Sequence, residues 1–249
     1  MFSRIKAFVD ATGEVLILFF QSLYWCRQIV KRRTLVLKQM FEVGNSSLGI
    51  CAMMGGFVGM ILTLQTGIQL KKYGAEEALG PLVGLSLIKE FGPVITAFVL
   101  AGRVGSAFAA EIGSMVVYEE VDSLKTMGVE PVAYLSMPRL LACLFVVPAL
   151  VIYSDIVGLM GGCLVAKTLV DVRPSLFLEQ FYLYTDLADI YKSLIKSTIF
   201  GAIIATVGCR EGFNTQGGPE GVGQSTTRAV VESFMLILIF DYFLERLMI

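Results

Sequence analysis

Long apolar stretches separated by polar connectors dominate this chain and predict a bundle of membrane helices. Five stretches stand out, at residues 45–70, 92–117, 139–168, about 194–209 and about 229–248. A helix over residues 92–117 would be about 39 Å long at 1.5 Å per residue, and a hydrocarbon core measures about 30 Å. We therefore expect an all-α integral membrane protein with five transmembrane helices, which form one domain over residues 45–249.

Small residues recur every four positions in several of these stretches. They are Ala97, Ala101, Gly105, Ala109 and Gly113 in the second stretch, and Ser154, Gly158, Gly162 and Ala166 in the third. Lipid gives helices no hydrophobic drive to associate, so membrane helices pack through such small-residue faces. We expect these helices to approach their neighbours closely inside the bundle.

The first 44 residues differ from the rest and predict an amphipathic helix that lies in the membrane interface. A moderately apolar run over residues 12–25 is followed by a basic segment. A cleaved signal peptide is the competing interpretation, but Glu14 interrupts the apolar run and no cleavage site follows. Seven of the 20 Lys and Arg residues precede the first span: Arg4, Lys6, Arg27, Lys31, Arg32, Arg33 and Lys38.

This excess of basic residues predicts the orientation of the chain. The N-terminus should be cytoplasmic, and five crossings then place the C-terminus outside. On this topology the loops at 118–138 and 210–228 are cytoplasmic, whereas the loops at 71–91 and 169–193 are external.

Composition and charge restrict the classes of function. Hydrophobic residues make up 55% of the 249 residues and charged residues only 16%, against about 25% charged in soluble domains. A net charge of -1 argues against a nucleic-acid partner. The chain has no histidine, and its five cysteines are far apart without a CxxC pair. We therefore expect no catalytic residue, no metal site and no bound cofactor.

The loop at residues 118–138 has the pattern of a short amphipathic helix that ends at Gly128. Acidic and basic residues (Glu119, Glu120, Asp122, Lys125 and Glu130) surround the apolar Val121, Leu124, Met127 and Val129. A solvated turn is one interpretation of this pattern. The other is a coupling helix that fits a groove on a cytoplasmic ATPase, because the spacing from Asp122 to Gly128 resembles the EAA-type loop of ABC importers.

The glycine-rich run at residues 218–225 fits the phosphate-binding pattern GxxxxGK[ST] except that Gln224 replaces the lysine. That lysine is the group that reaches the terminal phosphates of a nucleotide. The run is therefore not a nucleotide-binding loop, and we expect a flexible connection in which Thr226, Thr227 and Arg228 open the last helix. Any ATP must be bound and hydrolysed by a separate subunit.

Three segments together resemble the MlaE (YrbE-like) family of ABC-transporter permeases: GAEEALGPLVGLSLIKEFGPVITAFVLAGRVGSAFAAEIGSM, EEVDSLKTMGVEPVAYLSMPR and EGVGQSTTRAVVES. The resemblance covers roughly residues 45–249 and implies a homodimeric permease in the bacterial inner membrane. It also implies two copies of a cytoplasmic ATPase, a ring of Mce-domain protein on the periplasmic side, and phospholipid or a related lipid as cargo. The ATPase-coupling residues would then be Glu119, Glu120, Asp122, Lys125, Met127 and Gly128.

Charged residues inside the apolar stretches predict a polar patch in the outer half of the membrane. Lys89 and Glu90 precede the Gly92-Pro93 break, Lys196 enters the fourth stretch and Asp241 lies in the fifth. A charge at the membrane centre costs about 2.5–3.5 kcal/mol unless it pairs or meets water. We therefore expect Lys196 to pair with Asp241 or Glu90. The pair is either purely structural or part of a site near a lipid headgroup, and the resemblance places family charges at these three positions.

Two further sets of residues are candidates with a strong structural alternative. Leu62, Thr66, Leu70 and Tyr73 share one face at the outer end of the first span, which suits an acyl chain or ordinary helix packing. Arg103 and Asp155 form a second possible ion pair near mid-membrane, for which we favour a structural role. The substrate-binding candidates are thus Leu62, Leu70, Tyr73, Lys89, Glu90, Lys196 and Asp241.

Two other classes of function remain open from the sequence. A membrane-embedded enzyme that acts on lipids is disfavoured by the lack of histidine and of paired carboxylates within one span. A secondary transporter driven by protons through Glu90, Lys196 and Asp241 would be favoured by inverted repeats, and the two halves show none.

Overall fold

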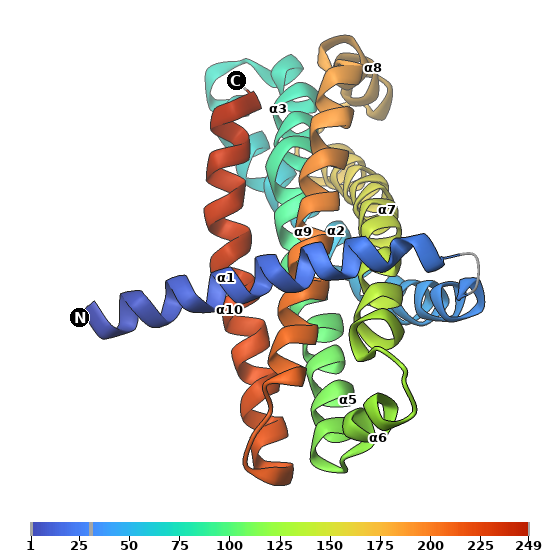
Figure 1. The fold of residues 1–249 in the computed structure, drawn as a ribbon. Coiled ribbons are helices and arrows are strands. Elements are labelled where there is room, and N and C mark those ends of the chain that lie inside the picture. Colours follow the sequence, from blue (N-terminus) through green and yellow to red (C-terminus); the bar gives the residue numbers. More distant parts are fainter. Residues whose placement is uncertain (1, 30–31, 249) are drawn as a thin grey trace.

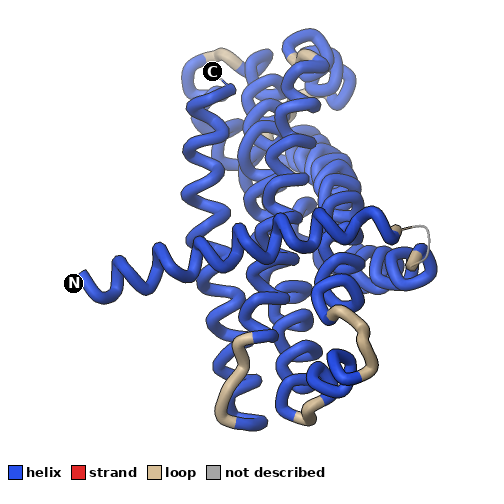
Figure 2. The backbone as a smooth tube through the Cα atoms, in the orientation of Figure 1, coloured by secondary structure: helices blue, strands red, loops and turns tan. Residues whose placement is uncertain are grey.

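The fold is a bundle of long helices joined by short loops, as the computed structural model describes it for residues 2–29 and 32–248 (Figure 2). The elements within these residues are α1 (Phe2–Tyr24), η1 (Trp25–Gln28), α2 (Arg33–Tyr73), η2 (Glu76–Ala78), α3 (Leu79–Ser86), η3 (Leu87–Phe91), α4 (Gly92–Leu100), η4 (Ala101–Gly105), α5 (Ser106–Val117), α6 (Glu120–Thr126), η5 (Val132–Ser136), α7 (Met137–Leu169), α8 (Pro174–Tyr184), α9 (Leu187–Phe213) and α10 (Gly218–Met248). The prediction of an all-α protein is confirmed.

Four helices in the described part of the chain are long and apolar enough to cross a membrane. They are α2, the continuous helical run Glu76–Val117, the run Val132–Leu169, and α9. The last predicted span, α10, does not meet this criterion, although it packs along α5 and α9 (Figure 1). Charged residues flank its apolar centre on both sides and lower its hydropathy: Arg228 and Glu232 before it, and Asp241, Glu245 and Arg246 after it.

The helices extend well beyond the apolar stretches that predicted them. Most of the expected connector at 71–91 is helical from Glu76 and continues into α4 through η3. The fourth span begins at Leu187 rather than near residue 194. The last helix begins at Gly218, so the glycine-rich run is its first turns and not a flexible loop. Hydropathy marks only the apolar middle of a membrane helix, because helix ends in water or headgroups carry polar residues.

One helix lies across the others. In Figure 1 the blue helix α1 crosses α9 and α10, which run alongside each other and alongside α5. One end of the bundle carries α6 and the loop before α10, and the other carries α3, α8 and the C-terminus; we call these the α6 end and the α8 end. The predicted cytoplasmic loops share the α6 end, and the predicted external segments share the α8 end. Lys31 and the side chains of Arg4 and Lys6 lie outside the described residues.

Glycines allow α2 and α7 to pack in backbone contact. A Cβ atom on Gly59 would lie 1.9 Å from the carbonyl oxygen of Gly158, and one on Gly55 would lie 2.4 Å from that of Ser154. Neither position can accept a larger residue without moving the helices apart. The prediction that Ser154 and Gly158 belong to a close-packing face is confirmed. This crossing fixes the first span against the third.

Candidate functional site

The predicted coupling loop forms a short helix, α6, that projects from the α6 end of the bundle (Figure 1). Val121 is buried and Leu124 half-buried against Ile112 and Cys209, so the apolar face of α6 packs on the second and fourth long helices. The helix ends at Thr126, two residues before Gly128, which has φ +74°, and the Val129 N–H donates to the Leu124 carbonyl over 2.9 Å. The predicted amphipathic helix is confirmed, and the left-handed backbone of Gly128 terminates it within two residues of the predicted end.

The coupling residues named from the sequence all face solvent. Glu119, Glu120, Asp122, Lys125, Met127 and Gly128 are exposed, and the Met127 side chain is 68% exposed. Lys125 pairs with Asp122 at 2.8 Å, three residues apart on the same helix. An exposed methionine beside acidic residues on a short, rigidly seated helix is suited to docking in a groove of another protein.

Near the α8 end, three carboxylates converge on one fully buried ammonium group. Lys196 Nζ lies 3.0 Å from Glu90 Oε1, 3.1 Å from Asp241 Oδ1 and 2.8 Å from Glu245 Oε2. The lysine side chain is 1% exposed, whereas those of Glu90 and Glu245 are each 39% exposed. We call this set, with the neighbouring pair Lys89 and Asp189 at 2.9 Å, the Lys196 cluster. The two outer carboxylates therefore reach the surface of the chain, whereas the ammonium group does not.

The backbone around Pro93 contributes to this cluster. Proline has no N–H, so it cannot donate the helical hydrogen bond to the carbonyl of Lys89 four residues earlier. That carbonyl instead accepts a hydrogen bond from Lys196 Nζ over 3.1 Å. The π-helical turn η3, Leu87–Phe91, lies directly before Gly92-Pro93 and presents Glu90 to the same ammonium. Such turns within helices are frequent at functional sites.

The prediction that Lys196 pairs with Glu90 or Asp241 is confirmed, since Lys196 pairs with both. The structure adds Glu245 and Asp189, which we did not select from the sequence. Glu245 lies four residues after Asp241 and therefore on the same helix face, which is a signal that the sequence carries. Asp189 and Lys196 are seven residues apart in α9 and also share a face.

The face predicted for an acyl chain divides into two parts in the structure. Leu62 and Leu70 are half-buried and pack against the apolar cluster around Leu79 and Phe177, which is helix packing. Tyr73 is 82% exposed at the end of α2 and lies apart from that cluster. Thr66 instead lines an open hollow of about 570 Å³ with Gln65, Ile68 and Gln69.

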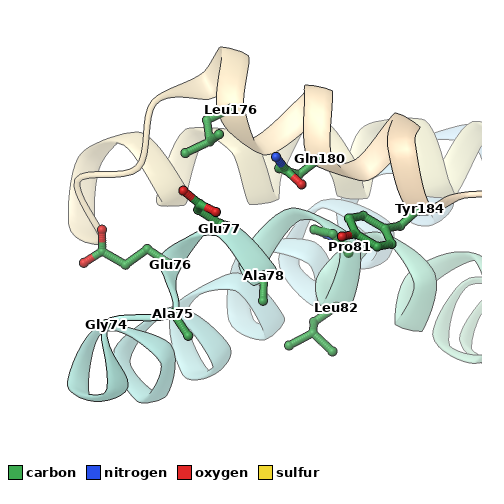
Figure 3. Close-up of a pocket in the computed structure, with 10 residues that line it drawn as sticks. All are labelled: Gly74, Ala75, Glu76, Glu77, Ala78, Pro81, Leu82, Leu176, Gln180 and Tyr184. Atoms are coloured by element: carbon green, nitrogen blue, oxygen red, sulfur yellow. The ribbon is translucent and has the colours of Figure 1, made fainter.

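A larger pocket of about 710 Å³ lies at the α8 end, between the segment after α2 and the helix α8 (Figure 3). Glu76 and Glu77 from η2 form one side, and Gln180 and Tyr184 from α8 form the other. None of the substrate-binding residues predicted from the sequence lines this pocket. Beside it, Lys71 donates a hydrogen bond of 2.9 Å to Asp171, and this contact lowers the pKa of the Asp171 carboxyl.

Arginines form a second polar layer where α1 meets the bundle. Arg210 bonds Glu14 of α1 at 2.9 Å, Glu211 at 2.7 Å and Glu232 of α10 at 2.9 Å. Arg139 bonds Glu111 at 2.6 Å, and the hydroxyls of Ser22 and Ser136 lie 2.9 Å apart. Neither arginine was predicted from the sequence to belong to a site. Their ion pairs hold α1, α5, α7, α9 and α10 at one level of the bundle.

The prediction of a second ion pair, between Arg103 and Asp155, is wrong. Arg103 donates to the hydroxyl of Ser47 over 2.9 Å rather than to Asp155. Asp155 is buried, and its Oδ1 has no hydrogen-bond partner among the described residues. It lies against Gly92, where a Cβ atom would be 1.8 Å from that oxygen. Similar depth along two helices did not bring the side chains together, because they face different neighbours.

Comparison with known proteins identifies the family. The MlaE permease family matches residues 36–247. A probable ABC transporter permease protein of Synechocystis sp. is 43% identical over 247 residues, which cover 99% of this chain and 91% of the relative. One of Rickettsia typhi is 39% identical over 215 residues, 86% of this chain and 83% of the relative. The chloroplastic protein TRIGALACTOSYLDIACYLGLYCEROL 1 of Arabidopsis thaliana is 38% identical over 209 residues, 84% of this chain and 60% of that protein.

These matches decide between the classes of function that the sequence analysis left open. They favour an ABC transporter permease over a proton-driven transporter and over a lipid-modifying enzyme. Such a permease is not catalytic and depends on a partner ATPase. The resemblance stated from the three sequence segments is confirmed over most of the chain. This multi-pass membrane protein therefore belongs to the MlaE permease family.

Proposed function

We propose that this chain is the permease subunit of a bacterial inner-membrane transporter that moves phospholipid, or a related lipid, between that membrane and an Mce-domain protein. The observation that carries the proposal is the match of residues 36–247 to MlaE permeases. The Arabidopsis relative supports a lipid cargo, because its name is that of a galactolipid, trigalactosyldiacylglycerol. Two copies of the chain pair with two copies of the ATPase at the α6 end and with a ring of Mce-domain protein at the α8 end.

In this proposal five helices cross the membrane, with α10 as the fifth, and α1 lies in the cytoplasmic interface. Support comes from the ion pairs at the level of α1, since Glu14, Arg210 and Glu232 would lie among the headgroups rather than in hydrocarbon. The N-terminus and α6 are then cytoplasmic, and the C-terminus is periplasmic. The basic residues before the first span favour the same orientation.

The cargo passes a cavity at the periplasmic end of a homodimer. The Lys196 cluster supplies the polar contacts to a lipid headgroup, with the two exposed carboxylates of Glu90 and Glu245 facing the cavity. Lys89 and Asp241 hold this arrangement, and Tyr73 lies exposed at the rim. Leu62 and Leu70 support the wall from behind, because they pack against α3 and α8.

Movement starts at α6. ATP binding brings the two ATPase subunits together and displaces α6, whose Val121 and Leu124 are packed against Ile112 and Cys209. Since side chains in a packed interface cannot be compressed, this displacement tilts the second and fourth long helices. Those helices carry Glu90 and Lys196, so the far cavity opens or closes as the helices tilt.

Purification from the native membrane tests the proposal directly. The tagged chain is extracted in mild detergent, and co-purifying proteins and lipids are identified by mass spectrometry. We expect an ABC ATPase, an Mce-domain protein and bound phospholipid. An ATPase with a cargo other than lipid, and no Mce-domain protein, would refute the lipid assignment while keeping the permease.

A further inference from the structure

A separate groove lies between α7 and α8, away from the Lys196 cluster. It has a volume of about 480 Å³, within the range of about 300–1,000 Å³ that is usual for ligand pockets. Its α7 wall consists of Ile156, Leu159, Met160, Cys163, Leu164 and Lys167, and its α8 wall of Pro174, Leu178, Phe181 and Tyr182. Lys167 is the one charged residue in this lining.

The α7 wall of the groove follows one face of that helix. Its α7 residues recur at intervals of three and four and so occupy one helix face. From Ile156 to Lys167 the helix rises about 16 Å. Lys167 and Pro174, the first residue of α8, stand at one end of the groove, and Ile156 stands at the other.

The depth of the groove in the membrane follows from the position of α1. Ser136 contacts Ser22 of α1, which the proposed orientation places in the cytoplasmic headgroup layer. The 31 residues from Ser136 to Lys167 rise about 46 Å, and a bilayer with its headgroups measures about 40–45 Å. Lys167 therefore lies in the opposite headgroup layer, and the groove leads from there into the outer hydrocarbon region.

Charge distinguishes this groove from an ordinary lipid-facing surface. Lys167 is exposed and makes no salt bridge within the described residues. Asp171, four residues later, is already paired with Lys71 at 2.9 Å. An ammonium group at the headgroup level attracts anionic lipid, and the tyrosine in the lining is a residue type enriched at that level.

We propose that this groove binds a glycerophospholipid with an anionic headgroup, such as a phosphatidylglycerol. One acyl chain lies along α7 from Cys163 to Ile156, and the lipid phosphate meets Lys167. The inference takes its membrane orientation from the proposed function. The groove is distinct from the transport cavity, because none of the residues that line it belongs to the Lys196 cluster.

Photo-crosslinking tests the site. The full chain, with its co-purifying partners, is placed in phosphatidylcholine nanodiscs that contain a small fraction of either phosphatidylglycerol or phosphatidylcholine with a diazirine on one acyl chain. We expect phosphatidylglycerol to label residues 156–167 and 174–182 about fivefold more than phosphatidylcholine does. Lys167→Glu should abolish this preference, and Met160→Trp should reduce labelling by both lipids. Lys72→Glu, an exposed lysine at the same end, is the matched control and should change neither.

Equal labelling by the two lipids, or a preference that survives Lys167→Glu, would mean that only bulk lipid visits the groove, and the inference would be wrong. Crosslinks from these residues to a protein would assign the groove to a partner and also overturn it. The measurement needs no ATP and no transport. A failed lipid-transport assignment would therefore leave a lipid preference intact, and the two failures can be told apart.

Discussion

Lys196 shows how one residue organises the polar interior of this protein. Its ammonium group is fully buried and has four oxygen atoms within 3.1 Å, from three carboxylates and the Lys89 carbonyl. A buried ammonium is stable only with such partners, and the carboxylates in turn depend on it. Helices η3, α9 and α10 are therefore tied together at this point.

Replacing Lys196 with methionine should destabilise the protein by about 2–4 kcal/mol, because three carboxylates would lose their cation. Partial exposure of Glu90 and Glu245 keeps the cost at the lower end of what buried pairs show. Thermal unfolding in detergent measures this effect. Lys192→Met, one turn earlier and without a salt bridge in the described residues, is the control. Equal stability of the two variants would mean that the ion pairs of Lys196 do not stabilise the fold.

The ion pair of Asp171 and Lys71 is exposed to solvent, unlike the buried Lys196. It predicts that the stability of the fold depends on pH. The hydrogen bond from Lys71 lowers the folded-state pKa of Asp171 below its value of about 3.9 in unfolded chains. The pair therefore stabilises the fold above pH 4 or so, and this contribution is lost as the pH falls through the folded-state pKa.

Asp171→Asn isolates this charge effect, because asparagine tolerates the φ of +64° at this position. The variant should have a slightly lower melting temperature than the wild type at neutral pH, and this difference in melting temperature should disappear in acid. A difference that widens on acidification would show that the carboxylate is not the stabilising form.

Among the elements, α2 and α7 make the closest helix contact that we describe. Gly59→Ala would put a methyl group 1.9 Å from the Gly158 carbonyl oxygen. The helices would have to separate, which should cost about 1–3 kcal/mol. Gly49→Ala is the matched control on the same helix: it has no atom within 4 Å of a new Cβ and should be neutral or gain up to about 1 kcal/mol from helix propensity. Unfolding of both variants in detergent gives the comparison, and a harmless Gly59→Ala would disprove the close contact.

What the sequence could predict differs between elements. The apolar centres of the long helices and the amphipathic α6 followed from periodicity, because burial in lipid or protein selects residue type directly. The ends of the helices did not: residues 218–228 are helical without being apolar, and charged residues (Glu76, Glu77, Lys89 and Glu90) interrupt the apolar residues of 76–91. The glycines and charged residues in those segments indicated loops. The segments are nevertheless helical, because neighbouring helices and water can accommodate these residues.

Side-chain partners could be predicted only where the arrangement of helices left few choices. Lys196 had few carboxylates at its depth, so its pairing with Glu90 and Asp241 was predictable. Arg103 and Asp155 also lie at similar depths, but Arg103 contacts Ser47 and Asp155 contacts Gly92. Rotation of each helix about its axis decides this, and tertiary packing sets that rotation. Arg210 was missed because its three partners come from α1, α9 and α10.

The bundle separates two polar ends that differ in their side chains. The α6 end presents an exposed helix with acidic residues and Met127, and the α8 end holds the Lys196 cluster. The helical run Glu76–Val117 connects them, since it carries Glu90 and leads directly into α6. A force applied at α6 can therefore reach the cluster through one continuous element.

The proposed transport cycle requires an ATPase that docks on α6, and co-purification of the ATPase with α6 variants tests this docking. In the double variant Glu120→Lys/Met127→Lys, two exposed side chains change while Val121 and Leu124 keep α6 seated. We expect the ATPase recovered per permease to fall about tenfold or more, with insertion unchanged. Tyr73→Lys/Glu77→Lys, an exposed pair at the opposite end, should leave recovery at the wild-type level. Wild-type recovery with the α6 double variant would contradict the proposed docking.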